Sequence, residues 1–343
     1  MKMGQKGLPT AAIVAIVVTV VVVIVAVAAS AVILLKPGEG GATPTGTPTG
    51  TPTTTTTIPT TTTTTTPTTT DLGQAENLLA SSSEKYDQAI RYWDENDYVN
   101  AKIRLIGAIT DVEEARKYLE KADIEQGGKQ YALCALDGWS NLLNCVISLS
   151  DAFEDYNQGM LRWSYQDWDG VVTKFLDAKE DIDRAQPYFL FAKENFDSVN
   201  VEMLPSELKS TVVEIRTYFA GYATLLPDFS GMTDAFVPLA RSMKSLVEAV
   251  NYMQRYDWHA SQLAFEDSQS KISEAKNKFD NLRYCQTASF SSYASILFVN
   301  SQKIENALSY YIQGCEYAEA GDMSSANSEF ETANQILNGI SWG

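Results

Sequence analysis

Four segments of the chain, each centred on an aspartate, carry the same residue types at the same offsets. The aspartates are Asp97, Asp167, Asp257 and Asp322. A small residue stands eight positions before each aspartate: Ala89, Gly159, Ala249 and Gly314. A large apolar residue stands one position after it (Tyr98, Trp168, Trp258, Met323), and a leucine or phenylalanine stands eight after it (Leu105, Phe175, Phe265, Phe330). These offsets fall on one helical face on either side of a turn. The pattern therefore predicts four helical hairpins whose second helix is capped by the aspartate, which accepts from free backbone N–H groups.

Small residues on both sides of each turn should let the two helices approach closely. The expected contacts are Ala89 with Ala101, Gly159 with Val171, Ala249 with Ser261, and Gly314 with Ala326. Apolar positions continue at plus eleven, fifteen, eighteen and twenty-two in the second helices, which is a heptad seam. We therefore expect an all-α domain, an array or bundle of long antiparallel hairpins packed side by side.

The unit resembles the tetratricopeptide repeat, which has a small residue, a tyrosine, a Gly-Asp-Tyr turn, an alanine and a phenylalanine at these offsets. The fourth unit agrees best, with Gly314, Tyr317, Gly321, Asp322 and Phe330 in place. The turns lie 70, 90 and 65 residues apart, against a period of about 34 in tandem repeats, and the closing proline is missing. The resemblance thus implies helical hairpins, whereas transfer of the family's peptide-binding groove is weakened.

Helical spacing predicts individual helices between glycine- and proline-containing breaks. The expected helices span residues 72–95, 97–121, 129–165, 167–196, 206–225, 234–255, 257–282 and 289–319. Pro187 should kink the fourth helix or end it early. Loops are predicted at Gly127-Gly128, at Pro205 and over Pro227 to Gly231.

Residues 11–35, from Ala11 to Leu35, contain no charged side chain and consist almost wholly of alanine, valine, isoleucine and leucine. About 20 such residues at ~1.5 Å each cross a hydrocarbon core of ~30 Å. We predict one transmembrane helix here, with residues 1–10 as a cytoplasmic N-terminus or leader. A cleaved secretory signal is the alternative, but apolar residues follow directly after its candidate cleavage sites.

Residues 36–70 form a run of threonine, proline and glycine. Such a segment has nothing to bury and is typical of an O-glycosylated stalk, with an unmodified linker as the alternative. Lys2 and Lys6 before the apolar segment favour a cytoplasmic N-terminus. We therefore expect a single-pass plasma-membrane protein whose residues 71–343 form an extracellular helical domain.

The N-terminus, Lys6-Gly7-Leu8-Pro9 followed by the apolar segment, resembles the class III signal peptides of archaeal pilins and other surface proteins. The resemblance implies cleavage after Gly7, so that Leu8 begins the mature chain, and an archaeal origin. The acidic residue that many bacterial pilins carry soon after the cut is missing.

Charge and composition exclude several classes of function. Residues 71–343 hold 42 acidic and 23 basic side chains, a net charge of −19, which argues against nucleic acid or anionic lipid as a partner. The single histidine, His259, has no neighbours in sequence that would complete a triad or a metal set. Asp167-Trp168-Asp169-Gly170 lacks the other ligands of a calcium loop, and the acidic pairs Glu113-Glu114 and Glu180-Asp181 are interpreted as solvated faces. We predict no enzyme activity, no cofactor and no metal.

The four cysteines would face an oxidising exterior if this topology is right. Cys134 and Cys145 lie in one predicted helix, about 16 Å apart, too far to bond each other. Cys134 and Cys285 lie at similar distances before their turns, so they form the one predicted disulfide. Four reduced buried thiols are the alternative.

These features favour a surface-anchored interaction or scaffold module that docks a protein partner of unspecified identity. The alternatives are a pilin-like subunit of a surface filament and a surface receptor for a small ligand. Self-association is left open.

Overall fold

The structure is a computed structural model that describes residues 70–123, 126–200 and 223–340, together with Val213, Arg216, Thr217 and Phe219. These residues form eight α-helices and no strand, which confirms the all-α prediction for this part of the chain. The helices are α2 (Asp71–Asp94), α3 (Tyr98–Lys121), α4 (Gln126–Ser164), α5 (Trp168–Ser198), α7 (Leu225–Met253), α8 (Trp258–Leu282), α9 (Ala288–Glu319) and α10 (Met323–Asn338).

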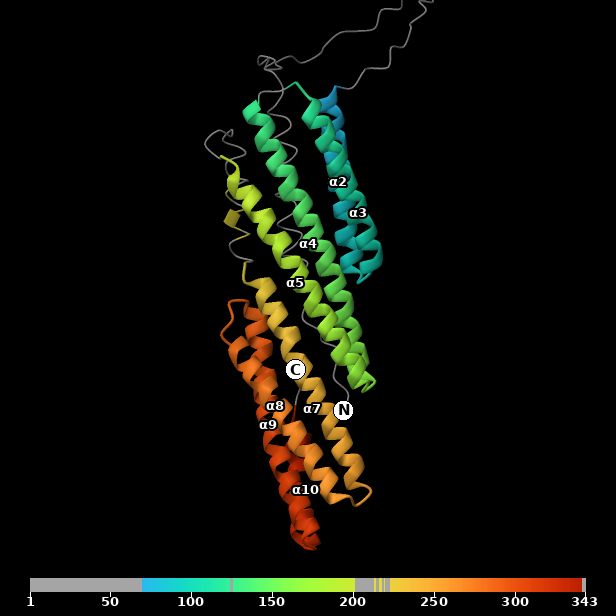
Figure 1. Cartoon of the computed structure of the whole chain (residues 1–343), viewed down its shortest axis with the longest axis vertical. Helices are drawn as coiled ribbons and strands as arrows, with labels where there is room; N and C mark the ends of the chain where they lie inside the picture. Colours follow the sequence, from blue (N-terminus) through green and yellow to red (C-terminus); the bar gives the residue numbers. More distant parts are fainter. Residues whose placement is uncertain are drawn as a thin grey trace, which may run out of the picture.

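Each helix packs against the one that precedes it and the one that follows it among these eight. Figure 1 shows an elongated molecule in which α2 to α5 occupy one end and α7 to α10 the other, and α5 and α7 join the two halves. A turn of three or four residues joins α2 to α3, α4 to α5, α7 to α8 and α9 to α10.

The four turns share one hydrogen-bond pattern. The residue before each aspartate has a positive φ: 60° at Asn96, 59° at Gln166, 62° at Tyr256 and 84° at Gly321. The aspartate N–H then donates to the carbonyl five residues back, at 2.8 to 3.1 Å. This is a Schellman motif, which satisfies the free carbonyls at the end of the first helix.

The same four aspartates begin the next helices. Each Oδ1 accepts from the backbone N–H three residues on, at 3.1 or 3.2 Å. Asp97, Asp167, Asp257 and Asp322 are thus the N-caps of α3, α5, α8 and α10. One residue therefore closes the first helix with its N–H and opens the second with its carboxylate.

Small residues line the contact between the helices of each pair. Ala89, Ala101, Ala249 and Ser261 are fully buried, and the Ser261 hydroxyl donates to the Ala249 carbonyl at 2.8 Å. The two glycines differ in the room around them. A Cβ on Gly159 would meet Phe175 at 3.4 Å, whereas a Cβ on Gly314 would lie 2.4 Å from a ring carbon of Phe330. The fourth contact thus has no space for a side chain.

Two buried tryptophans fix the register between α2 and α4. Trp93 donates from Nε1 to Ser150 at 2.6 Å, and Trp139 donates from Nε1 to Ser82 at 3.0 Å. Both pairs are 57 residues apart in sequence. Sliding one helix along the other would break both hydrogen bonds and leave buried polar atoms unpaired, which is costly.

Aromatic rings connect the two halves of the molecule. Phe229 of α7 stacks on Phe153 of α4 and on Phe290 of α9, with centroids 4.9 and 5.7 Å apart. Phe236 of α7 stacks on Phe175 of α5 at 4.9 Å. These rings are buried, so the junction is a continuous apolar core.

Prolines and glycines interrupt fewer helices than the sequence predicted. Helix α5 continues through Pro187 to Ser198, because Ala185, Ala192 and Phe196 on either side of the proline remain buried in the core. The predicted loop over Pro227 to Gly231 is wrong, since α7 begins at Leu225 and Pro227 lies in its first turn, where a missing N–H costs nothing. Gly127 and Gly128 likewise belong to the first turn of α4.

Other predictions fall outside the described residues. These are the leader with Gly7 and Leu8, the transmembrane helix over 11–35, the stalk up to residue 69, Pro205 and most of the helix predicted over 206–225. Among the described residues, α4 is long and apolar enough to cross a membrane, but most of its apolar stretch is buried inside the fold. Its composition is explained by its packing against α2, α3, α5 and α7.

Candidate functional site

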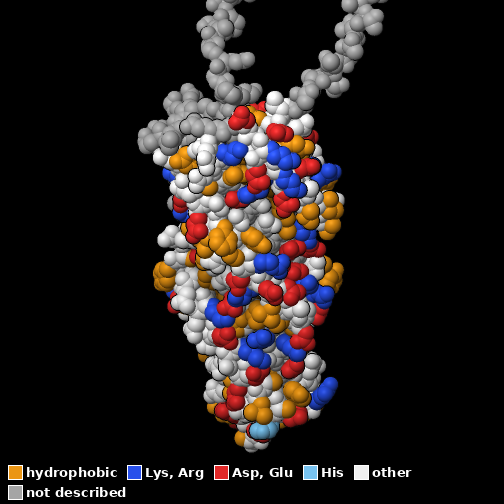
Figure 2. All heavy atoms as spheres, turned by 45° about the horizontal axis from the view of Figure 1, so that its top comes forward, with side chains coloured by type: hydrophobic (Ala, Val, Ile, Leu, Met, Phe, Trp, Pro, Cys, Tyr) orange, Lys and Arg blue, Asp and Glu red, His pale blue; other side chains and the backbone are white. Residues whose placement is uncertain are grey.

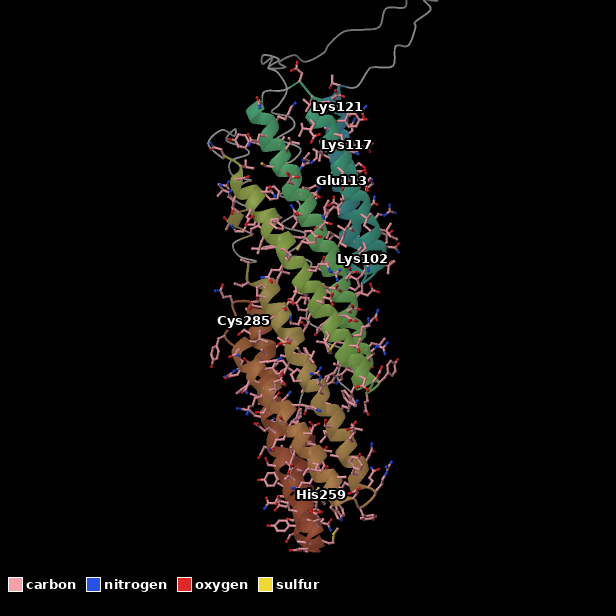
Figure 3. The ribbon with its side chains drawn as sticks, in the orientation of Figure 1. Lys102, Glu113, Lys117, Lys121, His259 and Cys285 are labelled. Carbon is pink, nitrogen blue, oxygen red and sulfur yellow. The ribbon has the colours of Figure 1, made fainter. Side chains whose placement is uncertain are left out.

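The acidic and histidine positions singled out from the sequence lie apart from one another. His259 is 70% exposed at the start of α8, and its Nδ1 lies 3.6 Å from Glu319 Oε1 (Figure 3). Among the described residues, no three His, Cys, Asp or Glu side chains could hold a metal ion together.

The carboxylates of the Asp167-Trp168-Asp169-Gly170 segment are already engaged. Asp167 accepts from the Arg162 guanidinium through Oδ2 (2.5 Å) and from the Gly170 N–H through Oδ1, and these two bonds lower the pKa of its carboxyl group. Asp169 pairs with Lys244 of α7 at 2.8 Å. The segment is a capped helix start that also links α5 to α7.

The prediction that Glu180-Asp181 is a solvated face is wrong for Asp181. Glu180 is exposed, but the Asp181 side chain is buried between α4 and α5, where it accepts from Arg184. Burial raises its pKa to about 6; Arg184 lowers it, while Asp151, Asp155 and Glu180 raise it further. Asp181 is buried while Glu180 is exposed because Asp181 lies at the edge of the buried face of α5, next to the core residue Ile182.

All four cysteines are free thiols in the structure, so the predicted Cys134–Cys285 disulfide is absent. Cys134 lies near the start of α4, at one end of the molecule, whereas Cys285 follows α8 near the middle (Figures 1 and 3). Equal distance from a turn does not give equal height, because the second half of the molecule is displaced along the long axis. Burial raises the pKa of Cys145 to about 12.

An exposed apolar stripe on α3 is the surface feature that sequence reasoning missed. Val99, Ile103 and Ile106 are 55, 57 and 56% exposed. Their spacing of four and three residues places them on one face of the helix, opposite the buried seam of Ala101, Leu105 and Ala108. We call these three residues the α3 stripe.

The equivalent positions of the other three pairs are more polar. Two, six and nine residues after the aspartate, α5 has Asp169, Thr173 and Leu176, α8 has His259, Leu263 and Glu266, and α10 has Ser324, Ser328 and Glu331. The same fold is therefore built without an apolar residue at most of these positions. Comparing these offsets between the four units would have located the α3 stripe in the sequence.

Ion pairs border the α3 stripe on both sides. Toward α4, Lys102 pairs with Asp151 at 2.6 Å and Glu154 at 3.1 Å. Burial lowers the pKa of Lys102, but these hydrogen bonds outweigh burial and the pKa is raised. Toward α2, Lys85 pairs with Asp111 of α3 at 2.6 Å.

The border thus consists of two lysines and three carboxylates that are held in ion pairs. Figure 2 shows that apolar side chains on the face in view gather in patches between such acidic and basic groups. An apolar centre with a polar rim is the usual anatomy of a protein-binding surface.

Beyond the α3 stripe, the same face of α3 becomes charged. Thr110, Glu113 and Lys117 continue the spacing, and all three are exposed. Figure 3 shows Lys102, Glu113, Lys117 and Lys121 following one another along α3.

No family model, no curated protein and no solved structure matches this chain.

Proposed function

We propose that this chain is a membrane-anchored interaction or scaffold module at the cell surface. In this proposal residues 11–35 anchor the chain, residues 36–70 form a glycosylated stalk, and the helical domain is an array of hairpins like those of tetratricopeptide repeats. The single observation that carries the interaction function is the α3 stripe, since each of its three β-branched side chains is more than half exposed.

Four features support the hairpin array. The turns share one hydrogen-bond pattern, the four aspartates cap the second helices, small residues lie between paired helices, and each second helix packs on the next first helix. The long helices leave the array extended, so its surface offers helix faces for a partner.

The first test addresses the topology. Protease added to intact cells that express the full chain should release an acidic fragment that begins near Asp71. The apolar segment and the stalk composition are the reasons for this expectation. Complete protection of the fragment behind a sealed membrane would show that the orientation is wrong.

The second test addresses the interaction. A variant with Val99→Asp and Ile103→Thr gives α3 the residues that α5 carries at the same two positions, so it should fold. Chemical crosslinking on intact cells should show neighbours of the wild-type chain that are lost in this variant. Leu263→Thr on α8, at a position equivalent to Ile103, is the matched control and should keep the wild-type pattern. Identical patterns for all three chains would contradict an interaction through α3.

A pilin-like filament subunit is the second candidate, and Lys6-Gly7-Leu8 is the observation that favours it. Cleavage after Gly7, found by sequencing the mature N-terminus, together with filaments in the purified material would support this candidate. A monomeric or complex-bound chain with an uncut leader would support the scaffold.

A further inference from the structure

Three residues of α10 form a row that the fourth helix pair leaves partly uncovered. Met323, Phe330 and Leu337 stand one, eight and fifteen positions after the turn aspartate, so they lie seven residues apart on one face of the helix. We call these three residues the α10 row. Met323 is 41% exposed, and Phe330 and Leu337 are half-buried. Of the residues of α10, only Ala326 and Ala333, at plus four and plus eleven, are buried.

The equivalent rows of α3, α5 and α8 are covered by the first helix of the next pair. At plus eight and plus fifteen, all six side chains are at most 2% exposed: Leu105, Val112, Phe175, Ile182, Phe265 and Ile272. Each of the three helices packs on the helix that follows it. Phe175 stacks on Phe236 of α7, with centroids 4.9 Å apart, and Phe265 stacks on Tyr311 of α9, with centroids 4.7 Å apart. Wherever this row is buried, a following helix therefore covers it.

The α10 row has no such cover, because no helix follows α10 among the described residues. The ring of Phe330 contacts only rings of earlier helices, Trp258 of α8 and Tyr311 of α9, at centroid distances of 6.0 and 6.2 Å. Figure 1 places α10 at the end of the molecule opposite the start of α2. The α10 row is thus the free end of the array, and the three equivalent contacts indicate a helix as its occupant.

The charge around the α10 row indicates which kind of helix fits. Residues 304–340 hold six acidic side chains and no lysine, arginine or histidine. Glu305 is paired with Lys276 of α8, and four of the other five are exposed: Glu316, Glu319, Asp322 and Glu331. Glu331 directly follows Phe330, so it borders the row. Charge complementarity therefore favours an occupant with lysine or arginine beside its apolar side chains, and disfavours a second copy of this strongly acidic domain.

We propose that the α10 row binds a basic amphipathic helix of another protein, which lies along α10 as the first helix of a further pair would. The row is about 21 Å long at ~1.5 Å per residue, so a partner helix of three heptads covers it. Large apolar side chains of the partner pack on Phe330 and Leu337, and its cations face Glu331. The α10 row is separate from the α3 stripe, so this inference goes beyond the interaction proposed for α3.

Synthetic peptides test the proposal on the full chain in an uncharged detergent. The probe is a fluorescently labelled helix of three heptads, with leucine at the two core positions of each heptad and lysine at the flanking positions. A second peptide has glutamate in place of lysine, and a third keeps the lysines but has a proline at its centre, which breaks the helix. Fluorescence anisotropy at low salt, with empty micelles as the blank, should show the first peptide binding about tenfold more tightly than either of the others.

Two variants with the same change in charge locate the binding site. Met323→Lys with Glu331→Lys places new cations beside the α10 row and should weaken binding of the basic helix about tenfold. Leu176→Lys with Glu180→Lys makes the same change in charge on α5, where Leu176 is 42% exposed against 41% for Met323. This control should weaken binding less than about twofold. All four side chains are exposed, so both variants should keep the fold, and thermal unfolding checks this.

Loss of the tighter binding in the α10 variant alone would support the proposal. Equal weakening in the α5 and α10 variants would show a general attraction to the acidic domain and would overturn the site. Equal binding of the three peptides would overturn the basic helix as the partner. A dimer of the full chain that only the α10 variant abolishes in sedimentation would also overturn it, because a second copy would then cover the row. Both variants leave the α3 stripe intact, so these outcomes are independent of the test on α3.

Discussion

Helices α3 and α8 occupy equivalent places in the first and third pairs, and they agree on one face only. On the core side, Leu105 and Phe265, then Val112 and Ile272, are buried at matching positions. On the solvent side, the stripe of α3 corresponds to His259, Leu263 and Glu266 of α8. Packing therefore determines the inner face, while the outer face is free to differ. An apolar outer face is a property of α3 that the fold does not require.

The sharpest test of this difference compares the two faces of α3. Leu105→Ala removes a fully buried side chain, so we expect a loss of about 2–5 kcal/mol in the free energy of unfolding. Ile103→Ala, two residues away but 57% exposed, should change the isolated chain by less than about 0.5 kcal/mol. Urea unfolding of both variants at low protein concentration gives the comparison. Similar losses would mean that Ile103 is part of the core.

A second comparison concerns the residues that stand 12 positions before and 14 positions after the turn aspartate in the first and second helix pairs. The first helix pair has Lys85 and Asp111, joined at 2.6 Å, and the second has Asp155 and Asp181. The pKa of Asp181 is raised to about 6 in the folded state, against an unfolded value of about 3.9. Its protonated form therefore stabilises the fold below about pH 4, and this stabilisation is lost as the pH rises through about 6.

We expect Asp181→Asn to raise the free energy of unfolding by about 2 kcal/mol at pH 7 and to have little effect at pH 4. Asp111→Asn is the control, and it should destabilise the protein at pH 7 because Lys85 loses its partner. Urea unfolding of each variant and of the wild type between pH 4 and pH 7 measures these changes. Subtracting the free energy of unfolding of the wild type at each pH removes the contribution of the other carboxyl groups. A pH-independent difference for Asp181→Asn would contradict the shifted pKa.

Gly159 and Gly314, which stand eight positions before their turn aspartates, should respond oppositely to substitution. Gly314→Leu would drive a side chain into Phe330, whose ring is packed between Trp258 and Tyr311. We expect a loss of about 1–3 kcal/mol. Gly159→Ala adds a methyl group at an ordinary contact distance from Phe175 and should stabilise α4 by up to about 1 kcal/mol. Thermal unfolding of both variants measures the difference, and a stable Gly314→Leu protein would show that Phe330 can move aside.

Sequence reasoning located what local chemistry specifies. The helix starts after Asp97, Asp167, Asp257 and Asp322 coincide with the predicted turns, because capping and close packing constrain the residue type at each offset. It failed where tertiary packing determines whether a segment is helical. The start of α7 was placed nine residues too late, since Pro227 and Gly231 resemble a loop but lie in a helix whose Leu226 and Phe229 are buried.

The candidate surface was missed because it lies outside the repeat pattern. That pattern predicts Ala101, Leu105 and Ala108 on the packed face, and the structure buries all three. The pattern covers only positions that the four units share, whereas Val99, Ile103 and Ile106 have no apolar counterpart at most of the equivalent positions. The burial of Asp181 was missed because a neighbour on α4 cannot be assigned from the sequence of α5 alone.

The smallest expected effect concerns the left-handed residue before each aspartate. Glycine occupies this position in the fourth turn, as Gly321, whereas the second turn has Gln166 at a φ of 59°. Glycine adopts this conformation without the steric cost that other residues meet. We expect Gln166→Gly to stabilise the protein by about 1 kcal/mol and Gly321→Gln to destabilise it by a similar amount. Chemical unfolding of the two variants and of the combined variant measures these changes. They should cancel in the combined variant if the two turns are equivalent, as their shared hydrogen bonds indicate, and a loss of stability in Gln166→Gly would show that the glutamine side chain has a role of its own in the turn.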